Sequence, residues 1–324
     1  MFAYLGRRLV GIVPLLIGIT FISFTVIHIA PGSPMDLLTD MNPDASPELR
    51  QRLAEHWGLD RPIYVQYGLW LKRIAVGDFG RSLSRDARPV IDKVAEALPV
   101  TLTLNLMSLC IIMAVAIPIG VYSATRPYSL ADRVTTVFVF LGFAMPTFWL
   151  ALLCMMLFSV DLGWLPVSGL RSLDHENMTP AMQAWDSAKH LIMPVSIAAI
   201  TSLAGMSRYM RSSMLEVFRQ DYVTTARAKG LSERTVIYRH ALRNALLPVI
   251  TLLGLSIPGL IGGSVIFETI FAIPGMGRLF FGSVMSRDYT VVMGILVIGA
   301  VLTLLGNLLA DVMYSVADPR LRKR

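Results

Sequence analysis

The chain has 324 residues, of which 54% are hydrophobic and only 16% charged, and its mean hydropathy is +0.60. A soluble domain carries about 25% charged residues, and here the apolar residues form uninterrupted runs long enough to span a bilayer, which excludes a soluble globular protein. The net charge of +7 does not indicate nucleic-acid binding, because the basic residues lie beside the apolar runs, where cytoplasmic loops carry them. Cys110 and Cys154 fall inside apolar runs, and we interpret them as core residues rather than a disulfide or metal site.

Residues 1–30 begin with the basic pair Arg7 and Arg8 and continue as an apolar run from Leu9 to Ala30. This run is longer than the apolar centre of a signal peptide and about as long as a spanning helix. We therefore predict an uncleaved first transmembrane helix, with the basic pair holding the N-terminus in the cytoplasm.

Residues 31–97 have the composition of a soluble insert, with nine basic and ten acidic residues and therefore no cytoplasmic bias. The pattern predicts one helix over Glu48–Trp57 and a second over Ile63–Val76, which is aromatic on one side. The insert is too short for an independent core. We expect it to lie outside the cell and to pack on the spans or on a partner, and we name Trp57, Tyr64 and Tyr67 as its docking residues.

Five further apolar runs follow in a core that we place at residues 98–316, before a basic cytoplasmic tail at 317–324. The short connections rich in Arg and Lys all fall on one side if every run crosses the bilayer. The sequence therefore predicts an all-α integral membrane protein of about six transmembrane helices with both ends in the cytoplasm. The five later spans are expected at Pro99–Ala124, Val134–Val160 (interrupted by Gly142 and Pro146), Leu191–Ser207, Ala245–Phe267 and Tyr289–Ala310.

A polar, basic segment from Asp221 to Pro248 follows the fourth span and runs into the start of the fifth, and we place the cytoplasmic loop that carries it at residues 212–245. Gly230 can adopt positive φ and end one short helix, and Ser232 can cap the next, with Glu233 in its first turn. The segment therefore predicts two short amphipathic helices joined by a sharp turn at the membrane surface. Small residues on the first helix can enter a groove on a partner: Thr224, Thr225, Ala226 and Ala228.

Small and polar residues inside the fifth span have two interpretations, which the sequence leaves open. Helices in lipid associate through small residues, so the set could form an interface with a second subunit along a pathway, or ordinary packing within one chain. Gly259 and Gly263 are spaced as a GxxxG pair. The pathway or interface candidates are Gly254, Ser256, Gly259 and Gly263.

Ionisable residues are missing from the span centres, since Glu268 and Asp311 fall at span ends. An ion-driven carrier needs such a residue at mid-membrane, so the driving energy is expected to enter from outside the bilayer. Thr101, Thr103, Asn105 and Asn307 are interpreted as helix-to-helix hydrogen-bonding residues, with polar lining of a pathway as the alternative.

Catalytic motifs are also missing from the sequence. It contains no G-x-x-x-x-G-K-[ST] loop that would hold ATP phosphates, no H-E-x-x-H and no G-x-S-x-G, and its five histidines have no ligand spacing. We therefore expect no catalytic residue, no metal and no cofactor bound by this chain. A self-contained membrane enzyme or a passive channel is the competing class.

The segment around Gly230 resembles the EAA loop of ABC-transporter permeases. Thr224-Thr225-Ala226 stand where the family has EAA, so the leading Glu is absent, and the closing proline is delayed to Pro248. The dipeptide/oligopeptide/nickel branch is closer, since it typically reads DY-x-x-TARAKGL and then HALRNA-x-LP. Other segments that resemble this branch are GLDRPIYVQY (58–67), GDFGRSL (77–83), RSSMLEV (211–217), ETIFAIPGMGRL (268–279), RDYTVV (287–292) and ADPRLR (317–322).

This resemblance implies the type I ABC importer fold and a place in the bacterial inner membrane as a non-catalytic permease subunit. It further implies a second, similar permease, two ATPase subunits that use ATP and Mg, and an extracytoplasmic substrate-binding protein. Peptides are the expected cargo, with nickel, glutathione or another small solute as alternatives. The residues that would couple to an ATPase are Asp221, Tyr222, Thr224, Thr225, Ala226, Arg227, Ala228, Lys229 and Gly230.

Overall fold

The computed structural model describes residues 2–29 and 61–317, and the regular elements within these ranges are helices. The prediction of an all-α protein is confirmed for this part of the chain. Trp57 and the helix predicted over Glu48–Trp57 lie outside the described residues. The second predicted helix of the insert is present as α4 (Ile63–Ala75).

Among the described residues, three helices are long and apolar enough to cross a membrane: α5 (Val90–Thr125), α8 (Pro180–Phe218) and α14 (Tyr289–Ala317). Two bent helix pairs raise the number of candidate spans to five if each pair counts as one. The N-terminal helix α1 (Phe2–Ile29) covers the predicted first span, although its described apolar stretch, Gly11–Thr25, is shorter than a full span. Because α5 begins at Val90, the end of the predicted insert continues without a break into the second span.

The first bent pair follows the interruption that the sequence predicts at Pro146. Helix α6 (Leu130–Ala144) ends there, and α7 (Thr147–Cys154) continues through η1 (Met155–Asp161) after a bend of 103°. Met145 is extended, with ψ of 133°, because a residue before proline is excluded from the helical region.

The fifth span is broken, which corrects the prediction of a continuous helix over Ala245–Phe267. Helix α11 (Leu242–Ser256) ends early, a single turn η4 (Pro258–Leu260) follows, and α12 (Val265–Ile270) leaves at an angle of 46°. Pro258 has no N–H for the helix ladder, and Gly263 has φ of +62°. Gly259 and Gly263 therefore do not share one helix face.

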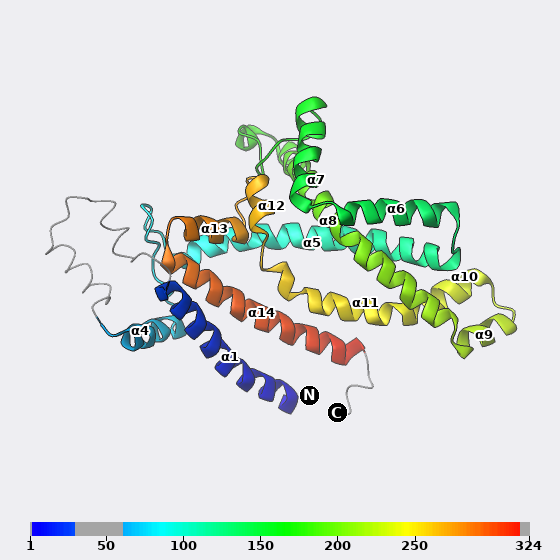
Figure 1. Cartoon of the computed structure of the whole chain (residues 1–324), viewed down its shortest axis with the longest axis horizontal. Helices are drawn as coiled ribbons and strands as arrows, with labels where there is room; N and C mark the ends of the chain where they lie inside the picture. The colour runs from blue at the N-terminus through cyan, green and yellow to red at the C-terminus, as the bar shows by residue number, and fades with distance from the viewer. Residues whose placement is uncertain (1, 30–60, 318–324) are drawn as a thin grey trace.

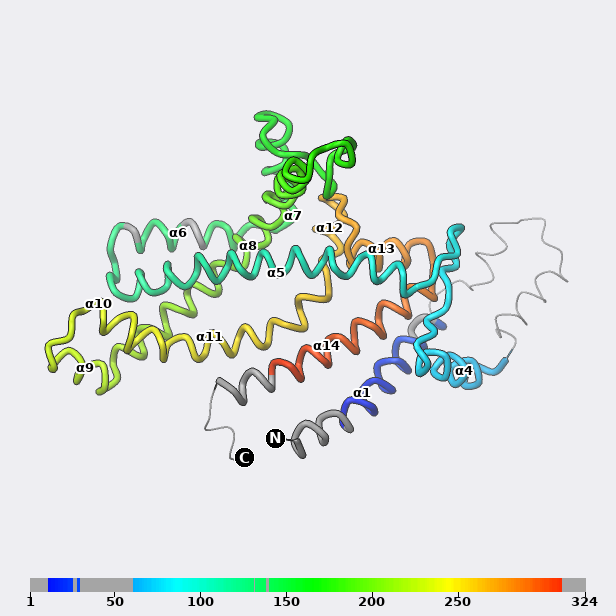
Figure 2. The backbone as a smooth tube through the Cα atoms, turned by 180° about the vertical axis from the view of Figure 1, so that it is seen from behind, coloured from blue at the N-terminus to red at the C-terminus, as the bar shows by residue number. Residues whose placement is uncertain are grey.

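The long helices run along the long axis of the molecule (Figure 1), and the view from behind shows the same order (Figure 2). Helices α5 and α8 make the most extensive contact, and α1 packs antiparallel along α14. The two helices approach closely at Gly120, where a Cβ would lie only 2.6 Å from Cβ of Met210. The absence of a side chain at Gly120 permits this approach. Small residues thus bring these helices together, as expected where lipid supplies no hydrophobic drive.

The two ends of the molecule carry different short elements (Figure 1). One end holds α9 (Asp221–Ala228), α10 (Glu233–Thr235) and η3 (Val236–Ala241), which follow α8 directly. The opposite end holds α13 (Met276–Met285), α4 and the loop at residues 77–89, where Arg81 forms an isolated bridge with Pro89. We call these the hairpin end and the loop end.

Candidate functional site

The polar segment between α8 and α11 forms the helix–turn–helix that the sequence predicts, and we call α9 with α10 and η3 the hairpin. Gly230 has φ of +75° and ends α9. The Ser232 hydroxyl accepts a hydrogen bond from the backbone N–H of Thr235 and so caps α10, with Glu233 in the first turn. The local turn chemistry is therefore confirmed.

One face of α9 is buried against the rest of the hairpin. Val223 and Ala226 pack on Val236, with Ala226 only 5% exposed. The small side chain of Ala226 therefore serves packing within the chain, which corrects the expectation that it faces a partner. The coupling candidates that remain on the exposed side are Asp221, Tyr222, Thr224, Thr225, Arg227, Ala228, Lys229 and Gly230.

Polar contacts fasten the hairpin to the helices on either side. The Arg227 guanidinium donates to Glu233, with 2.8 Å between Nε and Oε1, and lies 5.6 Å from the ring centre of Phe218 at the end of α8. The Asn244 amide donates to the Tyr222 hydroxyl over 2.7 Å, which ties α9 to α11. These contacts connect α9 to both α8 and α11.

A cavity of about 390 Å³ lies among α5, α7, α8 and α12. Its walls combine apolar side chains with hydroxyl, amide and carboxylate groups. None of the four predicted pathway residues is in this lining: Gly254 is buried in α11, Ser256 donates to the Leu252 carbonyl, and Gly259 and Gly263 flank the break after η4. The lining residues are Leu104, Asn105, Ser108, Thr147, Phe148, Pro194, Ala198, Thr201, Ser264, Ile266, Phe267 and Glu268.

Glu268, which the sequence places at a span end, is 2% exposed and lies in the wall of this central cavity. The Thr101 hydroxyl donates to its Oε1 over 2.9 Å, and the backbone N–H of Arg278 donates to its Oε2 over 2.9 Å. The Thr101 oxygen also accepts from the backbone N–H of Met276 at 2.8 Å. Glu268 therefore pins the α12–α13 turn to α5.

The hydrogen bonds predicted between helices are present for Thr101 and Asn105. Thr101 bonds Glu268, and the Asn105 amide donates to the Leu260 carbonyl over 2.7 Å. Thr103 instead donates to the Pro99 carbonyl within its own helix. No signal in the sequence pairs Glu268 with Thr101, because the two lie 167 residues apart.

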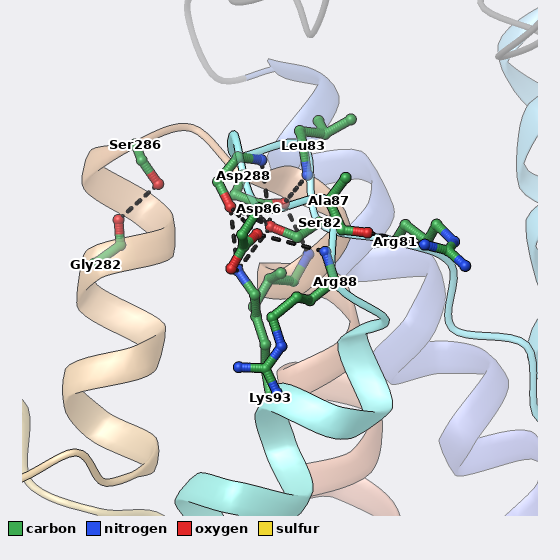
Figure 3. Close-up of polar contacts among 12 residues, drawn as sticks. Arg81, Ser82, Leu83, Asp86, Ala87, Arg88, Lys93, Gly282, Ser286 and Asp288 are labelled. Carbon is green, nitrogen blue, oxygen red and sulfur yellow. Dashed lines mark hydrogen bonds and ion pairs between the residues drawn. The ribbon is translucent and has the colours of Figure 1, made fainter.

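A second carboxylate fastens the loop end of the molecule (Figure 3). Asp288 accepts hydrogen bonds from the Ser82 hydroxyl, from the backbone N–H of Leu83 at 3.1 Å and from that of Val291 at 3.3 Å. The 77–89 loop is thereby attached to the start of α14, more than 200 residues later. Ser82 and Leu83 lie in the motif GDFGRSL (77–83) and Asp288 lies in RDYTVV (287–292), but nothing in the sequence pairs the two motifs.

Lys93 organises the remaining polar groups of this loop (Figure 3). Its ammonium donates to Ser82 and Ser84 and lies 2.9 Å from Oδ2 of Asp86. The hydrogen bond from Lys93, with a smaller one from Ser84, lowers the pKa of Asp86 from 3.8 to about 2. Asp86 therefore stays ionised over the whole range of ordinary pH.

A buried ion pair joins α6 to α8 toward the hairpin end. Arg211 Nη2 lies 3.3 Å from Oδ2 of Asp132, which is 4% exposed. Asp132 also accepts from the backbone N–H of Tyr128 at 2.9 Å. Its Oδ1 and the Nε of Arg211 are buried without a hydrogen-bond partner in the described chain.

Two family models match the sequence and together cover nearly its whole length. Residues 116–323 match the family described as the binding-protein-dependent transport system inner membrane component, and residues 1–105 match the N-terminal region of such components. The chain belongs to this family. It is a non-catalytic, multi-pass inner-membrane permease.

Curated relatives align with this permease from end to end. The oligopeptide transport system permease protein AppB of Bacillus subtilis is 47% identical over 321 residues, covering 99% of each chain. The dipeptide transport system permease protein DppB of Alkalihalophilus pseudofirmus is 39% identical, covering 99% of this chain and 100% of the relative. The di/tripeptide transport system permease protein DppB of Pseudomonas aeruginosa is 37% identical, covering 99% of each.

A solved structure of the MetNI methionine ABC transporter, in inward-facing conformations, shares the fold of this permease. Its TM-score is 0.54 at 16% identity, and the match covers 70% of the permease and 97% of the other chain. At this identity the similarity concerns the fold alone.

Two of the residues expected to dock a binding protein, Tyr64 and Tyr67, lie in α4 in different surroundings. Tyr64 is 74% exposed. The Tyr67 hydroxyl instead hydrogen-bonds Thr20 over 3.0 Å, and its ring meets Phe24 edge-on at 5.3 Å, so it fixes α4 to α1. Trp57 lies outside the described residues.

Ser172, His175 and Asp186, near the start of α8, do not form a catalytic triad. His175 Nδ1 lies 2.7 Å from Asp186, but the Ser172 hydroxyl donates to the same aspartate rather than to the histidine. A serine nucleophile needs its base within hydrogen-bonding reach. No group of three or more His, Cys, Asp or Glu side chains that could hold a metal ion is found in the described ranges.

Proposed function

We propose that this permease is the transmembrane subunit of an ATP-driven peptide importer, forms half of its translocation pathway and receives ATPase motion through the hairpin. The observation that carries the proposal is the construction of α9: one face is buried in its own chain, the other is exposed, and both neighbouring helices are tied to it. Full-length similarity to permeases named for oligopeptide and dipeptide transport supports peptides as cargo.

The proposed assembly has the type I importer architecture. It contains a second, similar permease, two ATPase subunits that bind ATP and Mg, and an extracytoplasmic substrate-binding protein. The hairpin end faces the cytoplasm together with both termini, since the basic residues near the chain ends follow the positive-inside rule. Residues 1–30, 31–97, 98–316 and 317–324 are proposed as the first span, the outer insert, the five-span core and the inner tail.

Closure of the ATPase pair moves α9, and the motion passes through its contacts to α8 and α11. Because α8 and α12 both line the central cavity, a shift of α8 relative to α12 changes the access to that cavity. Alternating access then follows as rigid rocking of packed helices, as in other transporters. The permease supplies no chemistry to this step.

Gly259, an exposed small residue at the break of the fifth span, is proposed to meet the second permease. Gly259 has open space around it, which allows a partner helix to approach closely. Gly254, Ser256 and Gly263 belong to the same stretch. On the outer insert, Tyr64 and Trp57 are proposed to contact the binding protein, while Tyr67 holds α4 in place.

Replacing Thr224, an exposed residue of α9, with tryptophan tests the docking role. In the complete transporter reconstituted into vesicles, Thr224→Trp should abolish ATP-dependent uptake while the permease remains assembled in the membrane. Leu173→Trp is the matched control, because Leu173 is fully exposed but lies in the connection between η1 and α8 rather than in the hairpin. Undiminished uptake by Thr224→Trp would rule out docking through this face of α9.

Cargo identity has its own test. Mass spectrometry of the small molecules that copurify with the complete transporter and its binding protein should find peptides. Finding nickel, glutathione or another solute instead would overturn the peptide assignment and leave the coupling role intact.

A further inference from the structure

Three segments far apart in the sequence meet at the loop end of the permease: Gly77–Leu83, Glu268–Leu279 and Arg287–Val292. These segments contain sequence motifs by which the chain resembles its family. They belong neither to the hairpin nor mainly to the central cavity, so the proposed function does not account for them. Asp288 joins the first segment to the third (Figure 3). Helix α13, which begins in the second segment, packs on α12, α5 and α14.

Buried carboxylates hold these segments in a fixed frame. Glu268 accepts the backbone N–H of Arg278, and Asp288 accepts the N–H groups of Leu83 and Val291. Both carboxylates are about 2% exposed and are occupied by these hydrogen bonds. Arg278, in contrast, is exposed.

A cavity of about 400 Å³ opens between the 77–89 loop, α5 and α13. Three basic side chains line it: Arg88, Lys93 and Arg278. Arg88 is paired with Glu96, and Lys93 with Asp86. Arg278 forms no ion pair within residues 2–29 and 61–317, so one guanidinium in the wall keeps an uncompensated charge.

We infer that this outer cavity receives a carboxylate side chain of the substrate-binding protein, with the Arg278 guanidinium as its donor; this rests on the proposed function. A guanidinium presents parallel N–H groups that match a carboxylate bidentately. Other arginines at this end, such as Arg287, are also exposed without an ion pair in the described ranges, but Arg278 lines the cavity, where the carboxylate of a partner can reach it.

The charge of the walls sets the kind of anion. Glu96 is paired with Arg88, and Asp288 also lines the cavity, so the wall offers one unpaired guanidinium, which matches a monovalent carboxylate better than a multiply charged phosphate. The central and outer cavities share no lining residue. Cargo that occupies the central cavity is therefore not in contact with Arg278, which favours the binding protein over the cargo as the source of the carboxylate.

The test measures the dissociation constant of the binding protein for the complete transporter in nanodiscs of phosphatidylcholine, where no anionic lipid competes. Arg278→Glu should weaken binding at least about tenfold, and Arg278→Lys should weaken it less because it keeps the charge but loses the bidentate geometry. Arg287→Glu is the matched control: Arg287 is exposed at the same end and lies outside the cavity lining. Its binding should stay within about twofold of the unsubstituted complex.

Fold is not at risk in these variants, because the bond from residue 278 to Glu268 uses the backbone N–H. An Asp→Arg or Glu→Arg substitution on the binding protein that restores binding to Arg278→Glu would identify the partner carboxylate. Unchanged binding by Arg278→Glu, or equal weakening by Arg287→Glu, would overturn the inference. If Arg278→Glu leaves binding unchanged but raises the KM for uptake, the carboxylate belongs to the cargo, and the assignment to the binding protein is wrong. A complex without substitutions that fails to bind the binding protein would instead refute the proposed function.

Discussion

The guanidinium of Arg227 bridges the turn at Gly230 to reach the carboxylate of Glu233, with 2.8 Å between Nε and Oε1. Both side chains are solvent-exposed, at 43% and 63%, so water and ions screen the pair. We expect Arg227→Gln to lower the free energy of unfolding by less than about 1 kcal/mol and Glu233→Gln to have a similar effect. Thermal unfolding of the purified permease in detergent checks this. A loss several times larger would mean that the pair, rather than the apolar contacts of Val223, holds the hairpin.

Gly230 should resist substitution because of its backbone and not because of its surroundings. Its φ is +75°, and a Cβ placed there meets no atom within 4 Å. Gly230→Ala should therefore cost about 1–2 kcal/mol from the left-handed conformation alone. Gly259→Ala is the control, since Gly259 also has open space but no positive φ; equal melting temperatures for the two variants would contradict this explanation.

Gly275 should resist substitution for the opposite reason, which is lack of space. A Cβ there would lie 2.5 Å from the Glu268 carboxyl carbon and 2.6 Å from the Thr101 hydroxyl. Gly275→Ala should lower the free energy of unfolding by about 1–3 kcal/mol by overpacking and should loosen α13. Gly282→Ala, later in the same helix and with nothing within 4 Å, should be tolerated. Thermal unfolding measures both, and a stable Gly275→Ala variant would show that the carboxylate is free to move.

Acid should weaken the 77–89 loop within a defined pH window. The hydrogen bonds from Lys93 and Ser84 lower the pKa of Asp86 from 3.8 to about 2. A lowered carboxyl pKa contributes stability above pH 3.8 that is lost as the pH falls through 2. Comparing the melting temperature of the permease with that of Asp86→Asn should show a difference at pH 5 that shrinks toward pH 2. A difference that stayed constant over this range would exclude Asp86 as its source.

The buried pair of Asp132 and Arg211 should behave non-additively. Removing one partner leaves the other group buried without compensation, which costs about 3–5 kcal/mol in a fully buried pair; with Arg211 30% exposed, we expect the lower end of this range. Asp132→Asn should therefore destabilise the permease more than the double substitution Asp132→Asn with Arg211→Gln. A double-mutant cycle of unfolding free energies measures the coupling, and additive effects would mean that the two charges do not interact.

Local chemistry made the hairpin predictable from the sequence, whereas its buried side was not. Gly230 and Ser232 act within a few residues of themselves, so the turn and the cap follow from residue type. The direction in which Ala226 faces depends on Val236, which lies across the turn. A pattern of small residues along α9 does not distinguish packing within the chain from a surface that a partner covers.

Longer contacts account for what the sequence could not provide. In the sequence, Glu268 lies at the end of an apolar run, which is typical of a residue at the membrane interface. Its contact with Thr101 depends on the fold, because the two residues are far apart in the chain. The break in the fifth span had a signal, since Pro258 precedes a pair of glycines at 262 and 263 that mark a loop. Hydropathy alone predicts a continuous span here, because the residues on both sides of the break are apolar.

The unwound stretch between α11 and α12 has a mechanical consequence. A helix transmits an axial displacement along its length, while a bend made of a single turn and a left-handed glycine absorbs it. In the proposed mechanism, we expect a displacement that enters at the inner end of α11 to be taken up partly by bending at this joint, so that α13 and the start of α14 move less than α11. The inner and outer ends of the permease can then move one after the other, so that the solute passage is not open at both ends at once.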